Sequence, residues 1–169
     1  MQTTVKLYAY GYWEVRTYLA ASLFVLGNIA LPRFFHLFPQ GGVTWLPIYF
    51  FTLVGAYKYG WRVGLLTAVL SPLVNSALFG MPPVAALPAI LLKSLLLAVT
   101  AGYTAFRFKR ASLVLLVGVV LAYQFVGTLG EWLMKGNFYL TVQDFHIGIP
   151  GMLLQVFGGY LFINRFIRK

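Results

Sequence analysis

A chain of 169 residues that is 60% hydrophobic and 9% charged is too apolar for a soluble domain, where about a quarter of residues are charged. The mean hydropathy of +0.82 indicates an integral membrane protein. The length suits about six spans of about 20 residues with short connections, so we expect a single membrane domain over residues 1–169. The lack of Cys excludes disulfides, thiolate metal ligands and a Cys nucleophile.

Apolar runs divide the chain into six predicted transmembrane helices, so the expected fold is an all-α, polytopic membrane protein with six helices in one compact bundle. Gly, Pro and charged residues separate the runs. The second run is the shortest, and we expect its Pro47 in the first helical turn, where the missing N–H leaves no hydrogen bond unmade. The predicted spans are 17–35, 45–58, 61–79, 84–106, 111–134 and 147–166.

Basic residues fall almost entirely on one side of this predicted topology. With six spans the connections alternate between the two sides, and one side holds ten Lys and Arg while the other holds Arg33 and Lys135. The ten are Lys6, Arg16, Lys58, Arg62, Arg107, Lys109, Arg110, Arg165, Arg168 and Lys169. The positive-inside rule places their side, with both termini, in the cytoplasm. It also accounts for most of the net charge of +10 without a nucleic-acid partner.

The three connections on the other side are rich in Gly, Pro and aromatic residues and poor in charge. Their sequences are RFFHLFPQGGVTW, GMPPVAALP and KGNFYLTVQDFHIGIPG, which begin at residues 33, 80 and 135. Long loops of this kind tend to be functional and to cover the elements that they connect. We therefore expect the functional site at the outer face.

Five polar residues in the outer halves of four predicted spans suggest a cavity open to the outside. Two interpretations of Lys93 stay open: its ammonium reaches the outer headgroups, or it is an interior cation for a carboxylate of Glu131 or of a ligand. The other polar residues also suit ordinary hydrogen bonds between helices. The five candidate substrate-binding residues are Asn75, Lys93, Gln124, Glu131 and Gln155.

The span that carries Asn75 ends in SPLVNSALFGMPP, residues 71–83. Ser71 and Asn75 are one turn apart on the same helix face, and Pro72 between them frees a backbone carbonyl one turn earlier. Such polarity within a membrane requires protein or a wet cavity beside it. We therefore expect this helix to form one wall of the cavity, with a rigid Gly-Met-Pro-Pro turn at its outer end.

Aromatic and histidine side chains lie at the same depth. Trp45, Tyr49, Tyr123 and Trp132 suit either an interfacial aromatic belt or stacking on a flat ligand. His36 and His146 fall in outward connections, where they could cap the cavity, bind a metal or face solvent. Solvent is the favoured reading, because two isolated His without a ligand pattern do not indicate a metal site.

Small residues form stripes on several predicted helices. Ser94, Ala98 and Gly102 share a stripe on the fourth span, and Gly60 and Gly64 form a G-x-x-x-G pair, both of which favour close helix packing. A patch of Thr17, Ala20 and Ala21 on the first span suits packing or contact with a partner protein.

Motifs for catalysis are missing from the sequence. It has no H-E-x-x-H and no Walker A pattern, and only Glu14, Glu131 and Asp144 could do acid–base chemistry. We expect a protein that is not an enzyme, with no cofactor and no bound metal.

The stretch LPIYFFTLVGAYKYGWRVGLLTAVLSPLVNSALFGMPPVAALPAILLKSLLLAVTAG, residues 46–102, resembles the substrate-binding S component of energy-coupling factor (ECF) vitamin transporters. The likeness lies in a Gly-containing turn, a G-x-x-x-G pair and a Ser-Pro helix that ends in Gly-x-Pro. It implies a six-helix S-component fold in a prokaryotic cytoplasmic (inner) membrane. Such a protein captures a vitamin or cofactor precursor in an outward-facing cavity that the outer loops close.

The same resemblance implies partners. S components receive energy from a membrane T component and two ATPase subunits, although some are thought to work alone. In that family an Ala-x-x-x-Ala motif on the first helix contacts the T component. Thr17-x-x-x-Ala21, beside Ala20, is the nearest match here, and it departs from that motif at its first position.

Two functions from other classes stay open. A membrane scaffold subunit of the cell-shape machinery would also be short, basic and many-spanning, and its polar residues would only pack helices. A lipid or prenyl-carrier flippase would need a lateral opening. For the transporter reading, Lys93 and the scarcity of acids favour a carboxylate or another electron-rich group on the ligand, while His36 and His146 leave a cobalt corrinoid open.

Overall fold

The computed structural model describes residues 7–166, and within that range every regular element is helical. Among these described residues, four helices are long and apolar enough to cross a membrane. They are α1 (Val15–Phe35), α4 (Trp61–Phe79), the helix formed by η2 (Val84–Ala86) and α5 (Leu87–Phe108), and α6 (Leu113–Lys135). The prediction of an all-helical chain with several helices able to span a membrane is therefore confirmed, while the six spans stay a prediction.

A fifth candidate span is bent. It joins α7 (Phe138–Ile147) to the C-terminal helix, and the two halves meet at 49°. The C-terminal helix runs through α8 (Ile149–Leu153), η3 (Leu154–Gly158), α9 (Gly159–Leu161) and η4 (Phe162–Phe166), where η3 and η4 are π-helical turns. The outer connection after residue 135, which we expected as a loop, thus contains a ten-residue helix.

The predicted second span over 45–58 corresponds to a helix that begins at Pro47, with Pro47 in its first turn as predicted, and that is too short to count among the candidate spans. It consists of a 3-10 turn η1 (Pro47–Tyr49) and α3 (Phe50–Tyr59), and the separate short helix α2 (Gly41–Trp45) precedes it. Leu46 between them adopts a left-handed conformation, φ 46° and ψ 44°. The pyrrolidine ring of Pro47 disfavours the right-handed helical region for the residue before it, so the helix cannot pass through Leu46.

The short helix α3 lies at the centre of the bundle. It packs against α1, α4 and α5, and nearly all of its side chains from Phe50 to Lys58 are buried. Leu53 and Tyr57 of α3 belong to one buried core cluster with Leu97 of α5 and Leu116 of α6. Because its side chains face protein rather than lipid, α3 does not need the length of a lipid-exposed span.

Close helix contacts depend on small residues, as the sequence stripes predicted. A Cβ atom on Gly64 would lie 2.8 Å from the Cα atom of Ala56, and one on Gly102 would lie 2.8 Å from the Cα atom of Trp61. Only glycine permits these backbone approaches between α3, α4 and α5. Gly60 has a different role, because its φ of 100° makes the turn from α3 into α4.

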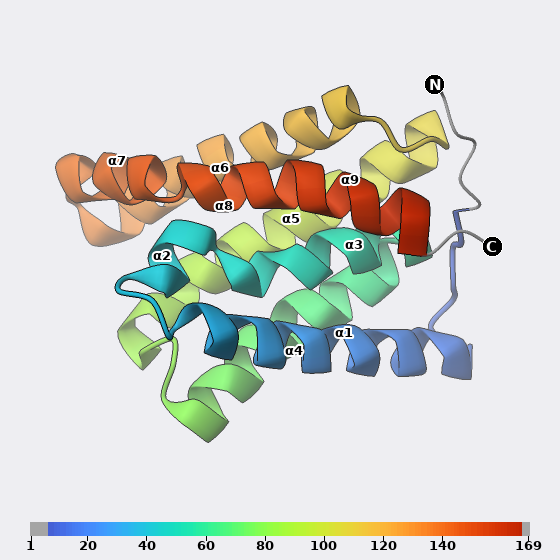
Figure 1. Cartoon of the computed structure of the whole chain (residues 1–169), viewed down its shortest axis with the longest axis horizontal. Coiled ribbons are helices and arrows are strands. Elements are labelled where there is room, and N and C mark those ends of the chain that lie inside the picture. The colour runs from blue at the N-terminus through green and yellow to red at the C-terminus, as the bar shows by residue number, and fades with distance from the viewer. Residues whose placement is uncertain (1–6, 167–169) are drawn as a thin grey trace.

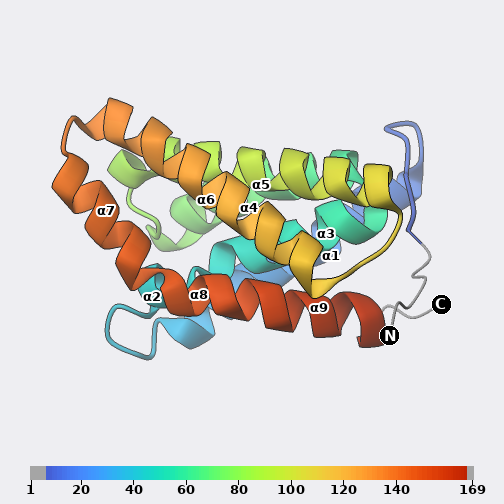
Figure 2. The ribbon, with the colours of Figure 1, turned by 90° about the horizontal axis from the view of Figure 1, so that it is seen from above.

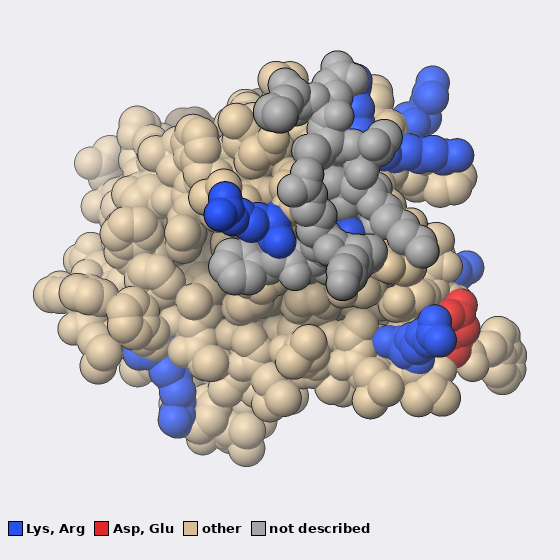
Figure 3. All heavy atoms as spheres, turned by 45° about the vertical axis from the view of Figure 1, so that its right-hand side comes forward, with Lys and Arg blue, Asp and Glu red and all other residues tan. Residues whose placement is uncertain are grey.

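The connections alternate between two ends of the bundle (Figures 1 and 2). The start of α1, the α3–α4 turn, the α5–α6 turn and the end of η4 gather at one end, which we call the basic end. The segments 36–49, 80–86 and 136–148 gather at the other, which we call the loop end. Figure 3 turns the basic end toward the viewer and shows Lys and Arg side chains around it. Lys6, Arg168 and Lys169 lie outside the described residues.

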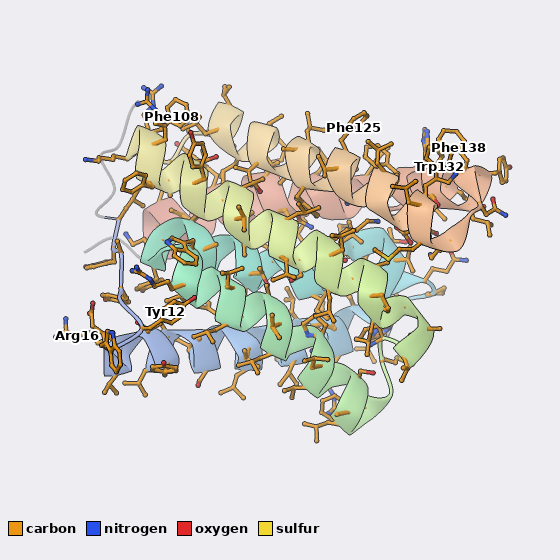
Figure 4. The ribbon with its side chains drawn as sticks, turned by 180° about the vertical axis from the view of Figure 1, so that it is seen from behind. Tyr12, Arg16, Phe108, Phe125, Trp132 and Phe138 are labelled. Atoms are coloured by element: carbon orange, nitrogen blue, oxygen red, sulfur yellow. The ribbon has the colours of Figure 1, made fainter. Side chains whose placement is uncertain are left out.

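Lipid-compatible side chains cover the outer surface of the bundle. Phe125 on α6 is 66% exposed and points away from the bundle, as Figure 4 shows. Aromatic rings mark both ends: Tyr12 and Phe108 lie at the basic end, and Trp132 and Phe138 lie together at the loop end. This arrangement is typical of a helix bundle with interfacial aromatic belts.

Candidate functional site

The loop end contains a cavity of about 480 Å³. Its walls come from the end of α1, the segment 36–49, α4, the 80–86 turn, α5, α6 and one residue of α7. The lining is mostly apolar, with Pro32, Leu46, Ile48, Pro83 and Ile90 among the wall residues. Its polar members are His36, Gln40, Tyr49, Asn75, Lys93, Gln124, Glu131, Lys135 and Asp144. An apolar pocket with a few placed polar groups is typical of a small-molecule site.

Six of the candidate binding residues from the sequence line this cavity together. Four of them, Asn75, Lys93, Gln124 and Glu131, come from the long helices α4, α5 and α6. The other two, His36 and Tyr49, come from the segment 36–49 that covers these helices. The predicted convergence of polar groups at one end of the bundle is thus present in the structure. Their contact with a substrate stays a prediction.

Asn75 is held by a buried hydrogen-bond network centred on Asn28 of α1. The Asn75 amide nitrogen donates to the backbone oxygens of Asn28, at 3.0 Å, and of Ser71, at 2.9 Å. The Asn28 side chain in turn donates to the hydroxyls of Thr52 and Ser71 and accepts from the Phe51 backbone N–H. This network joins α1, α3 and α4, and it leaves the Asn75 carbonyl oxygen without a partner among the described residues.

Four charged side chains form a chain of ion pairs along the cavity wall. Lys93 Nζ lies 2.5 Å from Glu131 Oε2, and Lys135 Nζ lies 2.5 Å from Glu131 Oε1 and 3.5 Å from Asp144 Oδ2. The prediction that Glu131 is the protein partner of Lys93 is confirmed. Because the Lys93 side chain is only 12% exposed, its ammonium is an interior cation rather than a headgroup contact.

Gly127 makes room for the Lys93 side chain. A Cβ atom on Gly127 would lie 2.5 Å from Lys93 Cγ, so the aliphatic part of the lysine runs directly over the α6 backbone. The ammonium therefore reaches Glu131 one helical turn further along the same face of α6. Any larger residue at 127 would push Lys93 away from its carboxylate.

Gln124 and Tyr49 bring unused polar groups to the cavity. Gln124 is only 2% exposed, and its Oε1 has no hydrogen-bond partner among the described residues. Tyr49 is 3% exposed, and the described residues give its hydroxyl no hydrogen bond. Buried polar groups are nearly always paired, so an unpaired one that lines a cavity is a candidate ligand contact.

Tyr123 and Gln155 stand behind this wall rather than in it. The Tyr123 hydroxyl donates to Gln155 Oε1 at 2.8 Å, and both side chains are fully buried. The ring of Tyr49 packs on the ring of Tyr123, with centroids 5.7 Å apart. These two candidates therefore support Tyr49 and are not part of the cavity lining.

Three further candidates lie apart from the cavity. Trp45 stacks on Phe35, with ring centroids 5.4 Å apart, and Trp132 packs edge-on against Phe138 at the surface. His146 is exposed beside Phe145 on α7. Within residues 7–166 no three His, Asp or Glu side chains are grouped to hold a metal ion.

The patch on α1 faces the bundle more than its surroundings. Thr17 and Ala21 are buried, and the Thr17 hydroxyl donates to the backbone oxygen of Gly11. Ala20 is half-buried. A partner that docks on α1 would therefore contact exposed neighbours such as Leu19 and Leu23, both 66% exposed.

Sequence reasoning missed Asn28, Lys135 and Asp144. Asn28 carried the same signal as Asn75, an amide within an apolar run. Lys135 follows Glu131 by four residues, a spacing that brings opposite charges together on a helix. Asp144 gave no such signal, because only the fold of α7 brings it to Lys135.

Comparisons with protein-family models, with curated proteins and with solved structures found no match to this chain.

Proposed function

We propose that this protein is the substrate-binding membrane subunit of an uptake transporter for a vitamin or cofactor precursor, similar to an ECF S component. The observation that carries the proposal is the cavity of about 480 Å³ at the loop end, where polar groups from α4, α5 and α6 converge beneath the 36–49 and 80–86 segments. Pockets of about 300–1,000 Å³ suit ligands of vitamin size.

The charge distribution supports an outward cavity. Basic residues gather at the opposite end of the bundle, and the positive-inside rule assigns that end to the cytoplasm. The proposal thus includes six membrane passes, with α3 as a short internal one, and cytoplasmic termini in a prokaryotic inner membrane. A ligand would enter from outside through the segments that form the loop end.

Energy would come from other chains. On the resemblance to S components we propose a membrane T component and two ATPase subunits as partners, with a solitary protein as the alternative. The lipid bilayer is the remaining partner, and the proposal assigns the chain no catalytic step.

Ligand binding is the test of this proposal. The purified protein is heated in detergent with B vitamins, lipoate and related compounds, and the shift in unfolding temperature is measured for each. We expect at least one compound to raise the unfolding temperature. Asn75→Ala and Lys93→Ala should weaken that effect, whereas the control Lys109→Ala, at the exposed basic end, should leave it unchanged.

A panel without any thermal shift would contradict the proposal. Morphogenetic proteins that co-purify with such an unliganded protein would then favour the membrane scaffold.

A further inference from the structure

The charges that line the cavity balance one another. Lys93 and Lys135 bracket Glu131, each at 2.5 Å, and Asp144 lies 3.5 Å from Lys135 on its other side. Two cations and two carboxylates leave no net charge on this wall. The Glu131 side chain is only 6% exposed, so its ion pairs lie largely out of water.

A ligand with a net charge fits this wall poorly. A carboxylate would have to take Lys93 or Lys135 from Glu131, and an uncompensated charge would then remain in a region of low dielectric. A cationic ligand would meet the two lysines. An uncharged ligand leaves the whole ion-pair chain intact, although Lys93 taken alone in the sequence favoured a carboxylate.

Among the described residues, the buried polar groups that line the cavity without a hydrogen-bond partner are amide groups and a hydroxyl. The amide nitrogen of Asn75 is used by two backbone oxygens, so its carbonyl oxygen is the group left to accept a hydrogen bond. Gln124 is only 2% exposed, and its side chain makes no hydrogen bond with a described residue. The Gln124 carbonyl oxygen is sealed within the protein, so its amide nitrogen is the group left to donate a hydrogen bond to a ligand.

We propose that the cavity binds an uncharged ligand through an amide or lactam edge, whose C=O group accepts a hydrogen bond from the Gln124 amide nitrogen while its N–H group donates to the Asn75 carbonyl oxygen. This inference rests on the proposed function and names its substrate class. Tyr49 and the proline-rich walls supply apolar contact around that edge. A site built to hydrogen-bond a ligand group discriminates strongly against an analogue that lacks it.

Matched compounds test this inference. Nicotinamide is compared with nicotinate and N,N-dimethylnicotinamide, and lipoamide with lipoate and its N,N-dimethylamide, beside the full vitamin panel. Within each set the acid adds a charge and the dimethylamide removes the N–H donors while the framework stays the same. We expect the primary amide to bind about tenfold or more tightly than either analogue, measured as thermal shift and dissociation constant.

A pair of variants assigns the effect to Gln124. Gln124→Met removes the amide at similar size and should weaken binding of the primary amide by about tenfold or more. Gln143→Met makes the same change at an exposed position on α7 and should have no effect. Unfolding of both variants without ligand shows whether they are folded.

The outcomes separate this inference from the proposed function. Preferred binding of the acids, or binding that Gln124→Met leaves unchanged, overturns the amide-edge inference and leaves the transporter proposal standing. A rise in unfolding temperature with other vitamins of the panel, when no amide binds, has the same two consequences. A panel in which nothing binds overturns both.

Discussion

Buried polar side chains in this bundle divide into those paired within the protein and those left unpaired. Asn28 uses its amide nitrogen, its carbonyl oxygen and its backbone oxygen in hydrogen bonds to α3 and α4. Gln124, at a similar burial, has no described partner. The first arrangement stabilises the fold, whereas the second lowers stability unless a ligand or water completes it.

This difference predicts opposite effects for two Gln substitutions on facing helices. Gln155 Nε2 is also buried without a described partner, but Gln155 Oε1 accepts from the buried Tyr123 hydroxyl, and Gln155→Met leaves that hydroxyl unpaired. We therefore expect the unliganded protein to lose about 1–3 kcal/mol of stability. Gln124→Met removes an unpaired buried amide, so we expect the unfolding temperature without ligand to stay the same or rise. Thermal unfolding in one detergent compares the two. An equal loss in both would show that Gln124 is a structural hydrogen-bonding residue.

The Lys93–Glu131 pair could be predicted from the sequence because the chain has only three acids and one of them lies at the right depth. The lack of a hydrogen-bond partner for Gln124 could not be predicted, because periodicity shows which helix face a residue occupies but not which groups of other helices lie next to it. Asn28 was within reach of the same reasoning as Asn75.

At the scale of helices, glycine contacts set the spacing of α4 and α5. A Cβ atom at Gly102 would lie 2.5 Å from Trp61 Cβ, whereas one at Gly118 on α6 would meet nothing within 4 Å. We expect Gly102→Ala to cost about 1–3 kcal/mol, because α4 and α5 must move apart. Gly118→Ala should be neutral or stabilising, since Ala favours helix more than Gly does. Similar unfolding temperatures for both variants would contradict this packing account.

The long helices α1, α4, α5 and α6 follow the apolar runs of the sequence closely. The short elements do not, because local signals decide them. Pro47 breaks the second run, and Asn137, whose side chain accepts from the Leu140 N–H, begins α7 within a connection. Both residues are visible in the sequence, but a prediction from hydropathy alone does not take account of single residues at helix ends.

At the scale of the whole molecule, the proposed topology places the loop end outside the cell. Because the chain has no Cys, single introduced thiols can test this placement. Leu37→Cys places a thiol at the loop end, where Leu37 is 76% exposed, and Arg110→Cys places one at the exposed basic end. We expect a membrane-impermeant maleimide to label Leu37→Cys in intact cells and Arg110→Cys only after the membrane is opened. The reverse pattern would place the cavity in the cytoplasm and contradict uptake.

The sequence predicted best which connections lie at which end of the bundle. Successive connections alternate between the ends, and the basic residues cluster in every second one, so both features can be read from their order along the chain. The cavity depends on three-dimensional coverage by the segments 36–49 and 80–86, and on Asp144 of α7. Hydropathy carries little information on how such connections fold over the helices.

Native mass spectrometry of the purified protein beside Gln124→Met tests the central claim most directly. The claim is that the loop-end cavity holds a small uncharged nutrient. We expect the unaltered protein to carry, or to acquire from the vitamin panel, one small molecule per chain, and the variant to lose it at lower collision energy. A chain that stays free of small molecules across the panel would contradict the account, and an adduct retained equally by both proteins would contradict the contact with Gln124.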